Sequence, residues 1–146
     1  MNALLRGEKL TTIFLNNAGY GQTGGQMAPT TLSDQMTTTT PYGRDVKIEG
    51  YPIKISEMLA LLEGAVYIER TAVNSPSNIK KTKKAIRKAF QVQLDGLGFS
   101  LVEILSPCPV NWKMNPLESW QWIDKQLTKR FPLGVIKDTT GEKDAN

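Results

Sequence analysis

The 146-residue sequence contains no histidine and only one cysteine, Cys108. The absence of histidine removes the most common general base and the most common transition-metal ligand. A single cysteine excludes an intrachain disulfide, and no cysteine-rich metal site can be completed by this chain alone. Because a lone thiol is typical of a reducing compartment, we expect a cytoplasmic protein.

Long hydrophobic runs are also missing. The longest apolar stretches, at residues 58–62 and 99–105, are much shorter than the roughly 20 residues that a membrane span needs. No basic segment and long apolar run follow Met1, so we expect neither a secretory signal nor a membrane partner. Hydrophobic residues nevertheless make up 40% of the chain, and the net charge is +4. This composition predicts one folded domain with a packed core.

Strand patterns alternate with helix patterns along the chain. We predict strands at residues 10–16, 65–73 and 99–105, and helices at residues 55–62, 76–95 and 118–130. The alternation is typical of an α/β fold with a parallel sheet flanked by helices. In such sheets, ligands bind beyond the carboxyl ends of the strands.

Local signals refine this prediction. The solid apolar run at 10–16 favours a strand buried on both faces. Ser56 is the predicted N-cap of the first helix, and Ser75 caps the second, with Pro76 in its first turn. The second helix carries an apolar stripe that predicts its buried face, formed by Ile79, Ile86, Phe90 and Leu94.

Two segments have no regular pattern. Residues 27–52 carry Pro29, Pro41 and Pro52, and they read as a long ordered loop. The charged tail from Lys137 onward is expected to fray. We therefore divide the chain into a domain at residues 1–138 and a tail at residues 139–146.

The most informative stretch runs from Asn16 to Gln26, with the sequence NNAGYGQTGGQ. Paired asparagines at the end of a strand offer hard oxygen ligands of the kind that Mg²⁺ binds. The glycines allow the backbone to approach an anion closely. Together these features suit a metal diphosphate, although composition alone favours an ordinary glycine-rich turn.

The continuation from Tyr20 to Thr31, YGQTGGQMAPTT, resembles the β subunit of 2-oxoacid:ferredoxin oxidoreductases. The branch that it resembles acts on 2-oxoglutarate or on branched-chain 2-oxoacids such as ketoisovalerate. The similarity extends along nearly the whole chain, to about Asp138. Further agreement lies at residues 40–44, 106–109, 111–112 and 131–135.

The resemblance implies a thiamine-diphosphate-binding fold and specific ligands. Asn17 would bind Mg²⁺ through its side-chain oxygen, and Gly19 through its main-chain carbonyl. The cofactor would supply carbanion chemistry, and no catalytic side chain is assigned in this chain. Four residues would border the thiamine diphosphate: Gly21, Gln22, Thr23 and Gly24.

The same resemblance implies an iron–sulfur role for Cys108 and a set of partners. In an intact subunit, Cys108 would be a ligand of a [4Fe–4S] cluster, although a lone thiol is usually only a small hydrophobic side chain. The partners would be α- and γ-type subunits, ferredoxin, coenzyme A and a 2-oxoacid. The family's Cys-Pro-X-Cys-Gly-His and Gly-Asp-Gly stretches do not occur here. We therefore expect the C-terminal portion of a longer subunit, without catalysis by this chain alone.

Two other functions stay open at this stage. One is a folded, non-catalytic remnant, and the other is a nucleic-acid-binding protein, which is less favoured because aromatic residues are sparse beside the basic helix. Arg44 either binds a carboxylate or forms a salt bridge that stabilises its loop. The tryptophans near the C-terminus favour a core or a subunit interface. The basic face, expected to be solvated, consists of Lys80, Lys81, Lys83, Lys84, Arg87 and Lys88.

Overall fold

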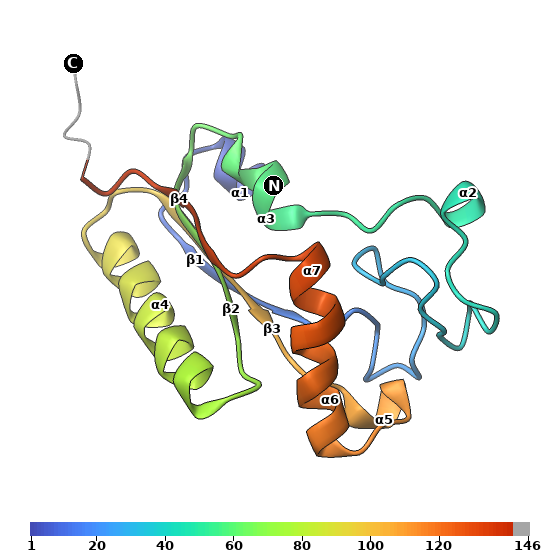
Figure 1. Ribbon diagram of the computed structural model, residues 1–146. Helices are drawn as coiled ribbons and strands as arrows, with labels where there is room; N and C mark the ends of the chain where they lie inside the picture. Colours follow the sequence, from blue (N-terminus) through green and yellow to red (C-terminus); the bar gives the residue numbers. More distant parts are fainter. Residues whose placement is uncertain (142–146) are drawn as a thin grey trace.

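The computed structural model describes residues 1–141, which form a four-stranded sheet with helices on both faces (Figure 1). The strands are β1 (Thr11–Asn16), β2 (Ala65–Ala72), β3 (Phe99–Leu105) and β4 (Gly134–Asp138). Their order is β1-β3-β2-β4; the first three are parallel, and β4 is antiparallel to β2. The predicted α/β class with a mainly parallel sheet is confirmed.

The predicted helices are present, with changed boundaries. Ser75 caps α4 as predicted, since its side chain accepts a hydrogen bond from the Asn78 amide at 3.2 Å. The last helix starts earlier than predicted, because Asn115 and Glu118 form a reciprocal capping box. The helical segments are α1 (Asn2–Leu5), α2 (Val46–Glu49), α3 (Ile55–Ala60), α4 (Pro76–Leu94), α5 (Pro109–Trp112), α6 (Pro116–Trp122), the π-helical η1 (Ile123–Leu127) and α7 (Thr128–Arg130).

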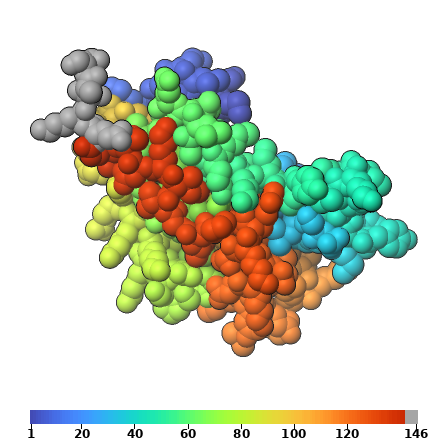
Figure 2. All heavy atoms as spheres, turned by 45° about the horizontal axis from the view of Figure 1, so that its top comes forward, coloured from blue at the N-terminus to red at the C-terminus, as the bar shows by residue number. Residues whose placement is uncertain are grey.

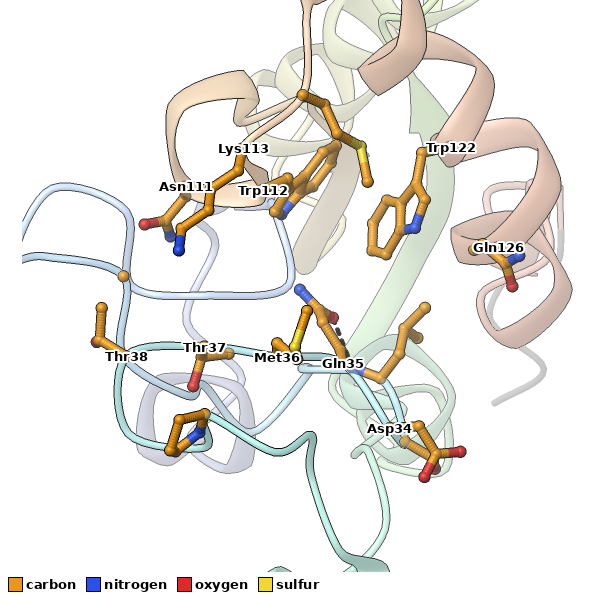
Figure 3. Close-up of a pocket in the computed structure, with 15 residues that line it drawn as sticks. Asp34, Gln35, Met36, Thr37, Thr38, Asn111, Trp112, Lys113, Trp122 and Gln126 are labelled. Atoms are coloured by element: carbon orange, nitrogen blue, oxygen red, sulfur yellow. Dashed lines mark hydrogen bonds between the residues drawn. The ribbon is translucent and has the colours of Figure 1, made fainter.

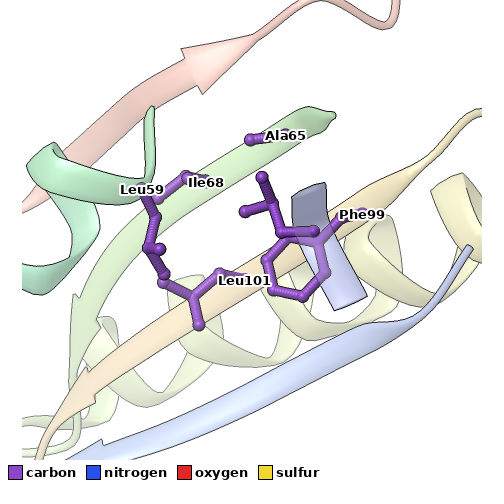
Figure 4. Packing of buried hydrophobic residues seen from close by; sticks show 6 residues of the cluster. Leu59, Ala65, Ile68, Phe99 and Leu101 are labelled. Carbon is purple, nitrogen blue, oxygen red and sulfur yellow. The ribbon is translucent and has the colours of Figure 1, made fainter. Parts of the chain in front are cut away.

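Successive side chains of a strand point to opposite faces of the sheet, so the buried hydrophobic residues form a separate cluster on each face. On one face, Leu101 packs with Ile68 and with Leu59 of α3 (Figure 4). On the other face, Val102 packs with Ala89 of α4. A third cluster joins the carboxyl ends of β2 and β3 to η1 and to Phe131, which follows α7. No helix within residues 1–141 has both the length and the apolar character needed to cross a membrane.

The prediction that the first strand is buried on both faces is wrong. Strand β1 lies at the edge of the sheet and pairs only with β3 among the described strands. Its side chains Ile13 and Leu15 are 38% and 64% exposed. An apolar run therefore marked the strand correctly but not its position in the sheet.

The predicted buried stripe of α4 is also wrong in part. Ile86 is half-buried and packs on the core, but Phe90 and Leu94 are 48% and 80% exposed. The helix turns a face of small residues to the sheet instead, because small side chains allow a close approach. That face consists of Thr82, Ala85, Ala89 and Val92.

Two local predictions fail for tertiary reasons. Lys54, and not Ser56, is the N-cap of α3; the Ser56 side chain is buried and donates a hydrogen bond to Glu103. Lys137 does not begin a frayed tail, because it lies in β4 opposite Ile68 and its Nζ donates to the Leu62 carbonyl at 2.8 Å. Thr139 of the predicted tail is also held, since its amide donates to the Val66 carbonyl at 3.0 Å. Residues 142–146 of that tail lie outside the described part.

The long loop at residues 27–52 is ordered, as predicted, around one arginine. Arg44 is 4% exposed and has no carboxylate partner among residues 1–141, so the predicted salt bridge is wrong, although the arginine does stabilise its loop. Its guanidinium instead donates to backbone carbonyls on both sides of the loop. The acceptors belong to Ala28, Pro29, Thr31, Glu49, Gly50 and Tyr51. The part of this loop around α2 protrudes from the molecule (Figure 2).

Candidate functional site

Two loops leave the carboxyl edge of the sheet side by side. Asn16 and Leu105 are the last paired residues of β1 and β3, and the Ser106 amide donates to the Asn16 carbonyl at 3.0 Å. The glycine-rich stretch at 17–26 and the loop at 106–116 therefore begin next to each other. The edge at which they meet is the one where parallel α/β sheets bind ligands.

The glycine-rich stretch closes on itself as a compact turn. The Tyr20 amide donates to the Gln26 carbonyl at 3.0 Å, and the Gly25 amide donates back to the Tyr20 carbonyl at 2.9 Å. Gly25 has φ +84°, and a Cβ at this residue would lie 2.1 Å from Oδ1 of Asn111. The left-handed backbone of Gly25 therefore favours glycine, and the Asn111 side chain occupies the space of the missing Cβ.

Asn17 and Gly19 present oxygen atoms that are free of protein partners. Within residues 1–141, neither the Asn17 side chain nor the Gly19 carbonyl takes part in a hydrogen bond. The Asn17 carbonyl does accept one, from Trp112 Nε1 at 3.2 Å, so its side-chain oxygen is the available atom. The amide and carbonyl oxygens fit a hard divalent cation such as Mg²⁺.

No acidic cluster accompanies these oxygens in the described part of the chain. Among residues 1–141, no three histidine, cysteine, aspartate or glutamate side chains gather in a metal-binding group. Because Mg²⁺ in proteins is commonly held by one or two carboxylates together with substrate phosphates, the oxygens of Asn17 and Gly19 fit a metal diphosphate better than a bare ion.

Asn16, the other half of the asparagine pair, does not face this position. It is 1% exposed; its Nδ2 donates to Glu103 Oε1 at 2.7 Å, and its Oδ1 accepts from the Ala18 amide at 3.1 Å. The expectation that both asparagines offer ligands is therefore wrong. Only Asn17 has a free side-chain oxygen.

Cys108 lies against the glycine-rich turn. A Cβ at Gly21 would lie 3.0 Å from the Cys108 Sγ and 3.4 Å from Nδ2 of Asn17. The thiol is partly exposed and is the only cysteine of the chain. One sulfur can be one ligand of a cluster, and the other thiolates would have to come from another polypeptide segment.

A buried ionic network lies beneath the site. Glu103 of β3 is fully buried and accepts from Arg70 Nε at 2.8 Å and from the Ser56 hydroxyl. Arg70 is buried as well and donates through Nη1 to Glu57 at 2.9 Å. Burial acts to lower the pKa of Arg70, but the hydrogen bonds with Glu57 and the charge of Glu103 outweigh it and raise that pKa.

A cavity of about 550 Å³ opens beside Gly25. Its apolar wall contains Trp112 and Trp122, whose ring centroids are 4.4 Å apart. Across the cavity lie Gln35 and Met36 of the long loop (Figure 3). The interpretation of the tryptophans as core holds for these two, because both also pack against the buried cluster below the site.

The structure brings together four of the predicted site residues, Asn17, Gly19, Gly21 and Cys108. The other three, Gln22, Thr23 and Gly24, lie on the exposed outer side of the turn, where Thr23 Oγ1 donates to Gln26 Oε1 at 2.8 Å. The six basic residues of α4 are exposed, as expected for a solvated face, and Lys88 pairs with Asp138. Three further residues that take part in the site were not predicted as site residues: Asn111, Trp112 and Glu103.

Comparison with known proteins identifies the family of the chain. Residues 1–104 match the family model described as thiamine pyrophosphate enzyme, C-terminal TPP binding domain. The chain is 42% identical over 142 residues to ketoisovalerate oxidoreductase subunit VorA of Methanothermobacter thermautotrophicus, a match that covers 97% of this chain and 30% of that subunit. It is 35% identical over 130 residues to 2-oxoglutarate synthase subunit KorB of Archaeoglobus fulgidus, covering 89% of this chain and 44% of that subunit.

A solved structure shares the fold. The 2-oxoglutarate:ferredoxin oxidoreductase from Magnetococcus marinus, solved with 2-oxoglutarate, coenzyme A and succinyl-CoA bound, superposes with a TM-score of 0.68 at 20% identity, covering 95% of this chain and 52% of that one. The chain thus spans between about a third and a half of the length of these relatives. The chain belongs to the thiamine pyrophosphate enzyme family, and its homologues are subunits of 2-oxoacid:ferredoxin oxidoreductases.

Proposed function

We propose that this chain is the thiamine-diphosphate-binding portion of a 2-oxoacid:ferredoxin oxidoreductase, which converts a 2-oxoacid to an acyl-CoA, releases CO₂ and reduces ferredoxin. The observation that carries the proposal is the pair of free oxygens on Asn17 and Gly19, at the carboxyl edge of a parallel sheet. The match to a TPP-binding domain supports the same cofactor.

In this proposal, Asn17 and Gly19 hold Mg²⁺ through the side-chain amide oxygen and the main-chain carbonyl. The turn from Gly21 to Gly24 borders the diphosphate and the thiazolium, and the absence of side chains at its glycines allows a close approach. Thiamine diphosphate supplies the carbanion chemistry when bound. The chain's own contribution is to position the cofactor and to exclude water from it.

The names of the relatives suggest the substrate and the co-substrates, and the resemblance to the family suggests the partner subunits. Ketoisovalerate and 2-oxoglutarate are the two proposed substrate types. The proposed partners are α- and γ-type subunits, with ferredoxin and coenzyme A as co-substrates. We propose that Cys108, beside Gly21, is one ligand of a [4Fe–4S] cluster whose other cysteines are supplied by another segment.

The test measures cofactor binding by calorimetry, with thiamine diphosphate titrated into the protein with and without Mg²⁺. The wild type and the control Asn2→Ala, which changes an exposed asparagine far from the site, should bind in a Mg²⁺-dependent manner. Asn17→Ala should weaken binding at least about tenfold, as expected for a lost metal ligand. Unchanged binding by Asn17→Ala would refute the assignment.

A second measurement separates an active subunit from a folded remnant. The chain is combined with the part of the ketoisovalerate oxidoreductase subunit that it does not span and with the other subunits of that enzyme, and 2-oxoacid-dependent reduction of ferredoxin is followed. Activity supports the proposed role. Mg²⁺-dependent binding without any activity in the assembled complex supports the remnant instead.

A further inference from the structure

Ala18 lies at the centre of the candidate metal position, just beyond the end of β1. It is fully buried and has φ +52°, a left-handed conformation that residues other than glycine rarely adopt. Its two neighbours in the chain are the proposed metal ligands, Asn17 and Gly19. Any force that fixes the conformation of Ala18 therefore also fixes the directions of the oxygens on either side of it.

Both peptide groups of Ala18 are held by side chains. The amide donates to Asn16 Oδ1 at 3.1 Å. The carbonyl accepts from Thr31 Oγ1 at 2.8 Å and from Gln35 Nε2 at 3.2 Å. The side-chain amide of Asn16 can accept from Ala18 only if its nitrogen points the other way, and that nitrogen donates to Glu103 at 2.7 Å. Glu103 thus sets the orientation of the Asn16 amide.

Glu103 is itself held as a carboxylate acceptor. Its second oxygen, Oε2, accepts from Arg70 Nε at 2.8 Å and from the Ser56 hydroxyl, and the side chain is fully buried. The carboxylate therefore presents an acceptor to Asn16 and has no alternative hydrogen-bonding arrangement. A chain of directed hydrogen bonds runs from Arg70 through Glu103 and Asn16 to the Ala18 amide.

We propose that Glu103 is a positioning residue for the metal site: through Asn16 it holds Ala18 in its left-handed conformation, and so directs the Asn17 side chain and the Gly19 carbonyl toward one ion. The proposal rests on the proposed function for the identity of the ligand. The hydrogen-bond chain itself requires no bound cofactor. Residues behind the ligands commonly control metal affinity by fixing ligand orientation.

The direction of these hydrogen bonds suggests a test in which donor and acceptor are exchanged between residues 16 and 103. In Glu103→Gln, the amide nitrogen of the new side chain would face the Asn16 nitrogen, because the oxygen of that side chain is needed by Arg70 and Ser56. The Asn16 amide then flips and offers a donor to the Ala18 amide, which breaks that hydrogen bond. Adding Asn16→Asp restores every bond, with the donor now on residue 103 and the acceptors on residue 16.

Two readouts are measured on the full chain. The first is hydrogen exchange of the Ala18 amide by NMR, without cofactor. The second is the affinity for thiamine diphosphate in the presence of Mg²⁺. Glu103→Gln should speed exchange and weaken binding, each about tenfold or more. The double variant Asn16→Asp/Glu103→Gln should return both values to within about threefold of the wild type.

The matched control is Glu57→Gln, which removes the other carboxylate from Arg70 and leaves the hydrogen bond between Asn16 and Glu103 in place. If the hydrogen bonds around Glu103 only stabilise the fold, the affinity for thiamine diphosphate should fall in proportion to the melting temperature in every variant, including the control. Our proposal predicts that the control melts at a lower temperature but keeps its affinity and its Ala18 protection. Proportional losses in the control would overturn the proposal.

The outcomes also separate this proposal from the proposed function. If the wild type binds no thiamine diphosphate, either alone or combined with the missing part of the related subunit, but exchange at Ala18 rises in Glu103→Gln and recovers in the double variant, the function is wrong and the positioning role stands. If the wild type binds and Glu103→Gln binds equally well, the positioning role is wrong. Should Glu103→Gln not fold, the double variant decides: a folded double variant without Ala18 protection refutes the proposal.

Discussion

Removal of the buried guanidinium of Arg70 is the perturbation with the largest expected effect on stability. Arg70 is fully buried; it contacts Glu57 and Glu103, donates to the Pro132 carbonyl at 3.1 Å, and lies 5.4 Å from the centre of the Phe131 ring. Arg70→Met keeps much of the apolar volume but leaves the buried Glu103 carboxylate without its counter-ion. Breaking one side of a buried pair costs about 3–5 kcal/mol.

That cost is a large part of the total stability, which for a domain of this size is about 5–15 kcal/mol. We expect Arg70→Met to lower the free energy of unfolding by about 4 kcal/mol, and to lower the melting temperature by about 10 °C. Urea unfolding, followed by tryptophan fluorescence, measures the first quantity, since Trp112 and Trp122 pack against the same core as Phe131.

The chain provides its own control for this prediction. Arg6 pairs with Glu8 at 3.3 Å, but their side chains are 70% and 49% exposed. Because exposed ion pairs contribute little, Arg6→Met should change the free energy of unfolding by less than about 0.5 kcal/mol. The reasoning fails if Arg70→Met costs less than about 1 kcal/mol, or no more than Arg6→Met.

Two further predictions concern the long loop and acid stability. Gly43→Ala should destabilise the protein by about 2–3 kcal/mol in urea unfolding, because φ is +96° and a Cβ would lie 2.8 Å from the Asp34 carbonyl oxygen. The control Gly50→Ala, with φ +73° and open space around it, should cost only about 1 kcal/mol. Equal losses in the two variants would contradict the steric argument. Burial acts to raise the pKa of Glu57, but hydrogen bonds from Arg70 outweigh it and lower the pKa. The Glu57 carboxylate therefore stabilises the fold at pH values above its unfolded pKa of about 4.3. This stabilisation is lost as the pH falls through the lower pKa of the folded state. Glu57→Gln should therefore flatten the fall in melting temperature below about pH 5, and parallel curves for the two proteins would refute this assignment.

Much of the sheet and its helices was predictable because the signals are local. The run at 99–105 matches β3, and Ser75 followed by Pro76 marks the start of α4, since strand propensity and capping depend on neighbouring residues. The glycine-rich stretch after β1 was also located by its own composition and by its resemblance to a known family.

Other features depended on partners that are distant in the sequence. Strand β4 forms because its residues pair with β2, about 70 residues earlier. Its local signal is weak, since only Val135 and Ile136 favour a strand before the charged residues begin. Phe90 belongs to a regular apolar stripe, yet it stays exposed because the sheet meets the small residues of α4 instead. The sequence indicates which face of a helix is apolar, but only packing selects the face that is covered.

The candidate site shows the same division. By itself, the sequence determined that an asparagine and glycines follow the first strand, and therefore which oxygens can be offered to an ion. Only the tertiary structure decided that Asn16 turns inward to Glu103 while Asn17 stays free. The physical reason is that a buried carboxylate must be satisfied by donors from several strands and helices, and those donors come together only when the chain has folded.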